Sequence, residues 1–276
     1  MSNHFTPAPA PRDLPDNATG EDLQEAWRTG RVFGPPIRRI FRDVITDRLP
    51  AGRRAPQAAM LFEPLADPFW ENDFWFLSDF YSVILHQDTC QPGTAEGVQL
   101  LAALALDDRI PPRHRFGAMD LLFSAATVAE RHLARCWPET PTCADPDSEA
   151  RTRSAVEASA PSLLARWEAE CPAVRLALAG LAVVFPTDRT LPALTPRLRQ
   201  FIDQHPLGTD TGDYVRFALV MAAQHDDETL AAVEKFTNAH WRGTSRGAPT
   251  RARALHLLGQ MLDKVGSNLT RSQPGE

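Results

Sequence analysis

The sequence predicts an all-α protein, and three observations support this prediction. Apolar residues recur three and four positions apart through most of the chain, which is the period of a helix with one buried face. Pro, Gly and Asp separate nearly all of these stretches, as they do at helix ends. Strict alternation of apolar and polar residues is missing, and no hairpin dipeptide stands between β-branched runs.

The first predicted helices form an N-terminal cap over residues 20–67. Residues 1–19 contain four prolines and few apolar groups, which predicts a disordered lead-in. The clearest helix of the cap is expected at residues 36–49, because Pro36 suits the first helical turn. Apolar residues, Val44 among them, then follow on one face at helical spacing.

The rest of the chain continues this pattern up to a short tail. Further helices are predicted at residues 58–65, 73–86, 95–106, 112–135, 149–170, 173–185, 191–204, 213–224, 226–241 and 250–265. An irregular, Pro-rich insert interrupts the series at residues 136–148. We therefore expect a single helical-repeat domain over residues 20–265, with roughly 10–12 helices, and a disordered tail at residues 266–276.

Three of the segments share an internal pattern: "PAVRLALAGLA", "GDYVRFALVMAA" and "TRARALHLLGQM". Aligning Arg175, Arg216 and Arg253 gives spacings of 41 and 37 residues, each with room for one more helix. Two helices in about 40 residues is the period of HEAT and armadillo repeats. Repeats of this kind bury their apolar faces by stacking on one another.

The segment "DTGDYVRFALVMAA" resembles the HEAT consensus, since Asp210 stands six residues before Arg216 and small residues follow. The resemblance implies a right-handed α-α superhelix, a HEAT- or armadillo-like α-solenoid. It also implies Asp–Arg ion-pair ladders between successive repeats. Only this unit has the full set, because Ala169 and Gly247 occupy the Asp position in the other two.

Composition limits the class of protein and its location. The net charge of −6 disfavours a general nucleic-acid binder. Of 29 basic residues only Lys235 and Lys264 are lysines, which together with the Ala and Pro content indicates a bacterial source. The N-terminus does not read as a secretory signal, and no membrane partner or membrane span is expected, so the predicted location is cytoplasmic. Four cysteines without tight spacing do not indicate a disulfide framework.

The stretch "DPFWENDFWFLSDFYSVILHQDTC", residues 67–90, combines aromatic rings with carboxylates and contains no Lys or Arg. It either forms the buried start of the helical core or a binding surface for a partner protein with a basic surface. In the second case rings supply anchors and carboxylates supply steering. The predicted partner-binding residues are Asp67, Trp70, Glu71, Trp75, Asp79 and Tyr81.

Chemical motifs are weak. His132, Cys136 and Cys143 could supply soft metal ligands, but their spacing matches no standard zinc pattern. The cluster "QHDDE" at residues 224–228 stands between two predicted helices, where capping is the expected role of its acids. No GxSxG, Walker-type loop, HExxH or GxGxxG motif is present. We predict no catalytic, cofactor-binding or metal-binding residues.

The leading functional hypothesis is a non-enzymatic scaffold or adaptor that binds another protein along a concave face. HEAT-like bacterial proteins of this size include adaptors, subunits of regulatory complexes and neutralising partners of secreted toxins. The alternative is a HEAT-like DNA glycosylase or another helical repeat protein that acts on nucleic acid, which the net charge disfavours. A structural part of a homo-oligomer is a third possibility, and the oligomeric state stays open.

Overall fold

The computed structural model describes Val44, Asp47 and residues 85–110, 112–187, 190–239 and 243–271. Within these residues the structure consists of nine α-helices and two short 3-10 helices and has no strand, which confirms the all-α class. The helices are α5 (Thr94–Ala105), α6 (Pro112–Ala126), α7 (Val128–Cys136), α8 (Pro146–Leu164), α9 (Pro172–Val184), α10 (Thr190–Ile202), α11 (Asp210–Ala223), α12 (Asp226–Ala239) and α13 (Thr250–Arg271). The 3-10 helices are η2 (His86–Asp88) and η3 (Trp167–Ala169). None of the described helices is both long and apolar enough to span a bilayer.

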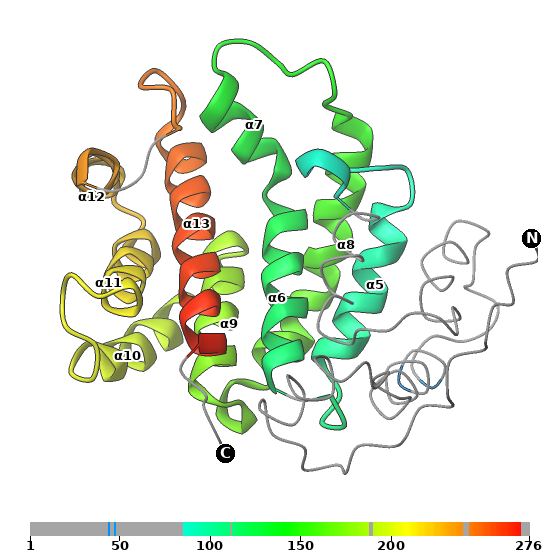
Figure 1. Ribbon diagram of the computed structural model, residues 1–276, viewed down its shortest axis with the longest axis vertical. Coiled ribbons are helices and arrows are strands. Elements are labelled where there is room, and N and C mark those ends of the chain that lie inside the picture. Colours follow the sequence, from blue (N-terminus) through cyan, green and yellow to red (C-terminus); the bar gives the residue numbers. More distant parts are fainter. Residues whose placement is uncertain are drawn as a thin grey trace, which may run out of the picture.

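The last helix of the chain lies in the middle of the described bundle. α13 runs beside α6, with α5 and α8 on one side of this pair and α10, α11 and α12 on the other (Figure 1). α13 packs against α6, α7 and α9 as well as against α11 and α12. A solenoid stacks each helical pair on its neighbours in sequence. The superhelical arrangement that the sequence predicts is therefore not confirmed by these contacts.

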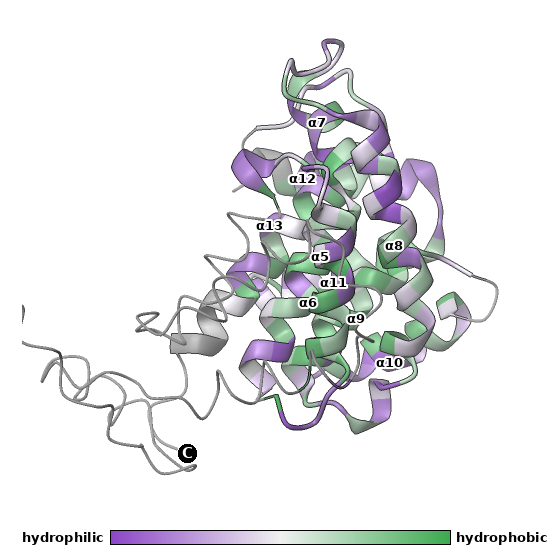
Figure 2. Ribbon diagram, turned by 90° about the vertical axis from the view of Figure 1, so that its right-hand side faces the viewer, coloured by the Kyte–Doolittle hydropathy of each residue, from purple (hydrophilic) through white to green (hydrophobic). Residues whose placement is uncertain are grey.

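The core is built around α9, in which ten of thirteen residues are buried. A helix that is apolar on all sides must be surrounded by other elements, and α9 packs against α6, α8, α10, α11 and α13. Figure 2 shows the same division, with apolar residues on α6 and α9 and hydrophilic residues along the outer α7 and α8. Phe123 of α6 lies between two glycines, Gly180 of α9 and Gly259 of α13.

Helix ends follow local signals in the sequence. Asp145 caps α8, because its side chain accepts a hydrogen bond from the Ser148 amide at 3.1 Å and Pro146 occupies the first turn. Thr209 caps α11 in the same way, through the Gly212 amide at 3.0 Å. The segment between α7 and α8 is therefore residues 137–145, which is shorter than the insert predicted at residues 136–148. α13 continues to Arg271, six residues beyond the end predicted at 265.

The single helix predicted over residues 112–135 is broken at Thr127 into α6 and α7. The Thr127 hydroxyl donates to the Phe123 carbonyl at 2.9 Å, while the Thr127 amide bonds to the Ser124 carbonyl instead, at 3.3 Å. A side chain that competes for a backbone carbonyl weakens the helical hydrogen-bond ladder and bends the chain. α7 therefore starts in a new direction.

The three aligned arginines share a structural role. Arg175 donates to the carbonyl oxygens of Trp167 and Glu168, and Arg216 donates to that of His205 at 2.8 Å. Arg253 is buried and pairs with Glu234 of the preceding helix at 2.7 Å. Each arginine thus ties its helix to the element before it. For Arg216 the acceptors are backbone carbonyls, including that of Gly212, rather than an Asp–Arg ladder.

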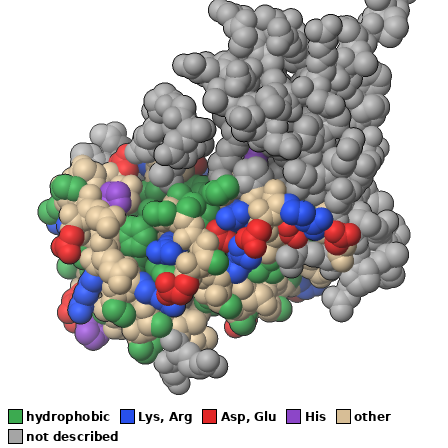
Figure 3. Space-filling view, turned by 90° about the horizontal axis from the view of Figure 1, so that it is seen from below, with side chains coloured by type: hydrophobic (Ala, Val, Ile, Leu, Met, Phe, Trp, Pro, Cys, Tyr) green, Lys and Arg blue, Asp and Glu red, His purple; other side chains and the backbone are tan. Residues whose placement is uncertain are grey.

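An ion-pair network joins the α5–α6 and α8–α9 connections at one end of the bundle. The buried Glu170 carboxylate accepts hydrogen bonds from Arg115 at 2.8 Å and from Arg166 at 2.6 Å. Arg166 also pairs with Asp108, and Arg109 pairs with Asp47 and Asp107. Figure 3 views the molecule from this end and shows acidic and basic side chains in alternation.

Candidate functional site

The six predicted partner-binding residues lie outside the described residues. They are Asp67, Trp70, Glu71, Trp75, Asp79 and Tyr81. Of the predicted N-terminal helix at residues 36–49, Val44 is helical and buried, as its apolar position indicates, and Asp47 is exposed. The binding role of the stretch at residues 67–90 stays a prediction.

The described residues contain another apolar surface, on the outer face of α7. Large apolar side chains are exposed at four described positions, Leu133, Trp137, Leu207 and Leu230. Leu133 (38% exposed) and Trp137 (42% exposed) are one helical turn apart, so they lie on the same face. Two adjacent exposed apolar groups of this size indicate a contact surface more strongly than isolated ones do.

The loop before α13 holds this surface in place. The Ser245 amide donates to the Ala134 carbonyl at 2.6 Å, and the Ser245 hydroxyl donates to the Arg135 carbonyl at 3.2 Å. These bonds satisfy carbonyls that the end of α7 leaves without helical partners. The Trp137 ring lies over Gly247, where a Cβ atom would stand 3.3 Å from the indole. We call Leu133, Trp137 and Gly247 the α7 end surface.

Polar side chains of α7, buried at Arg131 and His132 and exposed at Arg135, attach this helix to the bundle. Arg131 lies 3.4 Å and Arg135 lies 3.0 Å from the Asp88 carboxylate in η2. His132 Nδ1 lies 3.1 Å from Glu149 Oε1 in α8. These contacts fix α7 between η2 and α8, while its other face stays exposed.

Two groups in this region have shifted pKa values. Burial raises the pKa of the Cys90 thiol to about 11, and the nearby Glu149 carboxylate acts in the same direction, although a hydrogen bond with Thr152 opposes them. A thiol with this pKa is a poor nucleophile. Burial and the charges of Arg131 and Arg135 lower the pKa of His256 to about 4, so its imidazole is neutral at pH 7.

The metal-ligand pattern considered from the sequence does not assemble among the described residues. His132 faces Glu149, Cys136 is partly buried and Cys143 is exposed on the following loop. No group of three or more His, Cys, Asp or Glu side chains in the described part of the chain is arranged to hold a metal ion.

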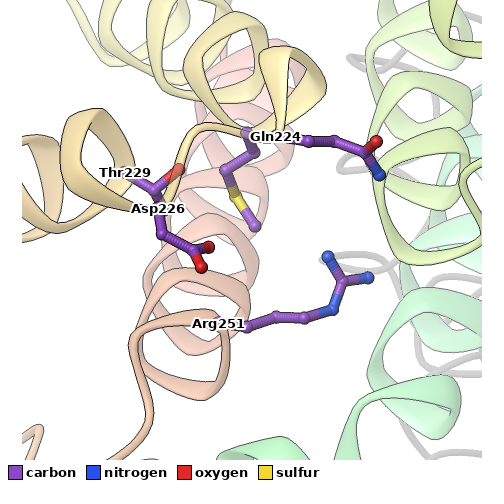
Figure 4. Close-up of a pocket in the computed structure, with 5 residues that line it drawn as sticks. Gln224, Asp226, Thr229 and Arg251 are labelled. Atoms are coloured by element: carbon purple, nitrogen blue, oxygen red, sulfur yellow. The ribbon is translucent and has the colours of Figure 1, made fainter.

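A small pocket lies where α11, α12 and α13 meet (Figure 4). Its volume is about 160 Å³, and its lining residues are Met221, Gln224, Asp226, Thr229 and Arg251. Gln224 and Asp226 belong to the "QHDDE" cluster, whose first two residues connect α11 to α12 and whose three acids begin α12. Asp226 is the first residue of α12 and lies on the pocket wall.

Arg251 forms the basic wall of this pocket. Its Nη2 donates to the carbonyl oxygens of Val183 at 3.2 Å and Val184 at 3.1 Å, at the end of α9. Burial lowers the pKa of Arg251, Glu130 opposes this shift, and the neighbouring Arg153 adds to it. The guanidinium is thus anchored and partly desolvated.

Sequence reasoning missed both of these features. Trp137 falls in the irregular insert predicted at residues 136–148, and Leu133 falls in the helix predicted at residues 112–135. Arg251 gave no signal, because its partners in α9 are 67 and 68 residues away. A Trp one turn after an apolar residue, directly before a Pro-rich loop, was the available signal for the α7 end surface.

Comparisons of the chain with protein-family models, curated proteins and solved structures find no match, so the α7 end surface and the pocket rest on the geometry of this chain.

Proposed function

We propose that the protein is a non-enzymatic scaffold that binds another protein, and that the α7 end surface is part of the contact. The observation that supports this is the pair of exposed apolar side chains, Leu133 in α7 and Trp137 directly after its last residue. Tryptophan is enriched among the residues that contribute most to protein–protein binding. A ring that is already held against Gly247 loses little conformational freedom when a partner binds.

We propose a HEAT-like arrangement for one part of the bundle. α9 packs on α10, α10 on α11 and α11 on α12, so these helices follow one another in space as in sequence. This supports a repeat-like segment that ends against the central α13. We propose that the protein is a cytoplasmic adaptor, of the kind that includes toxin-neutralising proteins. In this proposal the segment is a rigid support for the binding surface.

The alternative role in nucleic-acid chemistry receives no support from the described arginines. Most of them pair with carboxylates or donate to backbone carbonyls, while Arg199 and Arg246 are exposed. Among the first group are Arg109, Arg115, Arg131, Arg135, Arg153, Arg166, Arg175, Arg197, Arg216, Arg251 and Arg253. A groove for DNA needs basic groups that meet the phosphates. We therefore do not propose the glycosylase function.

Photo-crosslinking in the native host tests the proposal. A photoreactive residue at Leu133 should trap one defined partner, whereas the same residue at Leu207, which is 57% exposed in the turn between α10 and α11, should not. With the purified partner, Trp137→Ala should weaken binding by about 2 kcal/mol, roughly 30-fold, and Leu207→Ala should leave it unchanged. Equal affinity of the two variants would exclude the α7 end surface.

The stretch at residues 67–90 receives its own experiment. Charge reversal at Asp67, Glu71 and Asp79 should weaken capture of a partner with a basic surface, and more strongly at low salt. Unchanged capture would remove this stretch from the proposed contact without affecting the α7 end surface.

A further inference from the structure

The pocket between α11, α12 and α13 places groups of opposite charge around one small space. Figure 4 shows the Arg251 guanidinium and the Gln224 amide on one side and the Asp226 carboxylate on the other. The buried residues Met221 and Thr229 complete the lining. We propose that this pocket binds a free α-amino acid, whose carboxylate meets Arg251 and Gln224 and whose ammonium group meets Asp226.

The basic side of the pocket fits a carboxylate. Arg251 donates to both carbonyls of α9 through a single nitrogen, Nη2, and these bonds orient the guanidinium. Its Nε and Nη1 form no hydrogen bond with another described residue, so both can donate to a ligand. Arginine binds carboxylates through two parallel hydrogen bonds. Burial and Arg153 disfavour the charged form of Arg251, whereas Glu130 and Asp226 favour it, and a ligand carboxylate would act in the same direction as these two.

Gln224 occupies its place at a conformational cost. It ends α11 with φ 58° and ψ 28°, in the left-handed region, and glycine is the usual residue at this position. When a residue other than glycine occupies such a position, its side chain is a candidate for a function. In Figure 4 its amide lies on the same side of the pocket as the Arg251 guanidinium, so its NH₂ group can donate to the carboxylate of a ligand there.

The acidic side of the pocket distinguishes an amino acid from a simple anion. Asp226 is exposed and lines the pocket across from Arg251, so a bare anion such as phosphate would meet a carboxylate. An ammonium group removes this repulsion and forms a charge-assisted hydrogen bond instead. The Thr229 side chain belongs to the same wall.

The volume agrees with a ligand of this size. A cavity of about 150 Å³ in another protein holds a benzene molecule, and this pocket has a volume of about 160 Å³. An α-amino acid with a short side chain therefore fits. Met221 offers an apolar contact for that side chain.

Titration calorimetry on the full chain tests the proposal, with glycine, alanine, serine and the other common amino acids as separate probes. We expect saturable binding of at least one of them, with a Kd on the order of 1 mM or tighter. N-acetylation, which removes the ammonium group, and amidation, which removes the carboxylate, should each weaken binding about tenfold or more. Absence of saturable binding for all amino acids would overturn the inference, and so would binding of phosphate or acetate with equal affinity.

Matched variants locate the site. Asp226→Asn should weaken binding about tenfold, whereas Asp227→Asn, at the neighbouring exposed position outside the pocket, should not. Arg251→Gln should abolish binding, with Arg199→Gln on exposed α10 surface as its control. Equal effects in either pair would overturn the assignment.

Gln224→Gly separates binding from folding. Glycine relieves the left-handed backbone, so this variant should melt at a higher temperature than the parent chain. Loss of the amide should at the same time weaken amino-acid binding several-fold. A variant that is more stable and binds equally well would show that Gln224 takes no part in the site.

Discussion

Replacement of Glu170 by glutamine should destabilise the bundle by about 3 kcal/mol or more, because it leaves the buried Arg115 without a counter-charge and leaves Arg166 with Asp108 alone. The Glu170 side chain has no solvent exposure, and that of Arg115 is 8% exposed. Oε2 accepts from Arg115 at 2.8 and 3.2 Å, and Oε1 accepts from Arg166 at 2.6 Å. Removal of one partner from a buried pair costs about 3–5 kcal/mol, since a buried charge is then unpaired.

Urea unfolding, followed by circular dichroism, measures this effect through the midpoint at a constant slope. Glu168→Gln is the matched control: Glu168 is 76% exposed and pairs with Arg197 at 2.9 Å. An exposed pair contributes about 0–1 kcal/mol. The reasoning is refuted if the two variants lose similar stability, or if Glu170→Gln costs less than about 1 kcal/mol.

The core and the pH dependence supply two further predictions. Gly259→Ala would place a Cβ atom 2.9 Å from Cε1 of the fully buried Phe123, so we expect a loss of about 1–2 kcal/mol in urea unfolding. The loss should disappear in a Phe123→Leu background, and persistence there would contradict the clash. Burial, with the Asp263 charge, raises the pKa of Asp120 from 3.8 to about 7. The unfolded chain therefore ionises first as pH rises from 3.8 to about 7, and the Asp120 contribution makes stability fall across this window. We therefore expect the melting temperature of Asp120→Asn to fall less than that of the parent chain between pH 4 and pH 8. If both chains show the same dependence of melting temperature on pH, Asp120 does not titrate in this range.

The sequence determined the class and most helix positions, because these depend on contacts within a few residues. The helix predicted at residues 95–106 is observed as Thr94–Ala105, and the one predicted at 173–185 as Pro172–Val184. Their ends are set by local groups, such as the cap of Asp145 on α8.

Only the tertiary structure decided the order of packing and the candidate sites. Leu133 follows Met119 by about four helical turns, so an unbroken helix would have placed it close to the face on which Met119 is buried. The break at Thr127 turns α7 and leaves Leu133 exposed beside Trp137. Glu170 meets Arg115 across 55 residues, and Arg251 meets α9 across 67 and 68. Such long-range pairs are determined by the way whole helices pack. The apolar period along a single helix does not predict them.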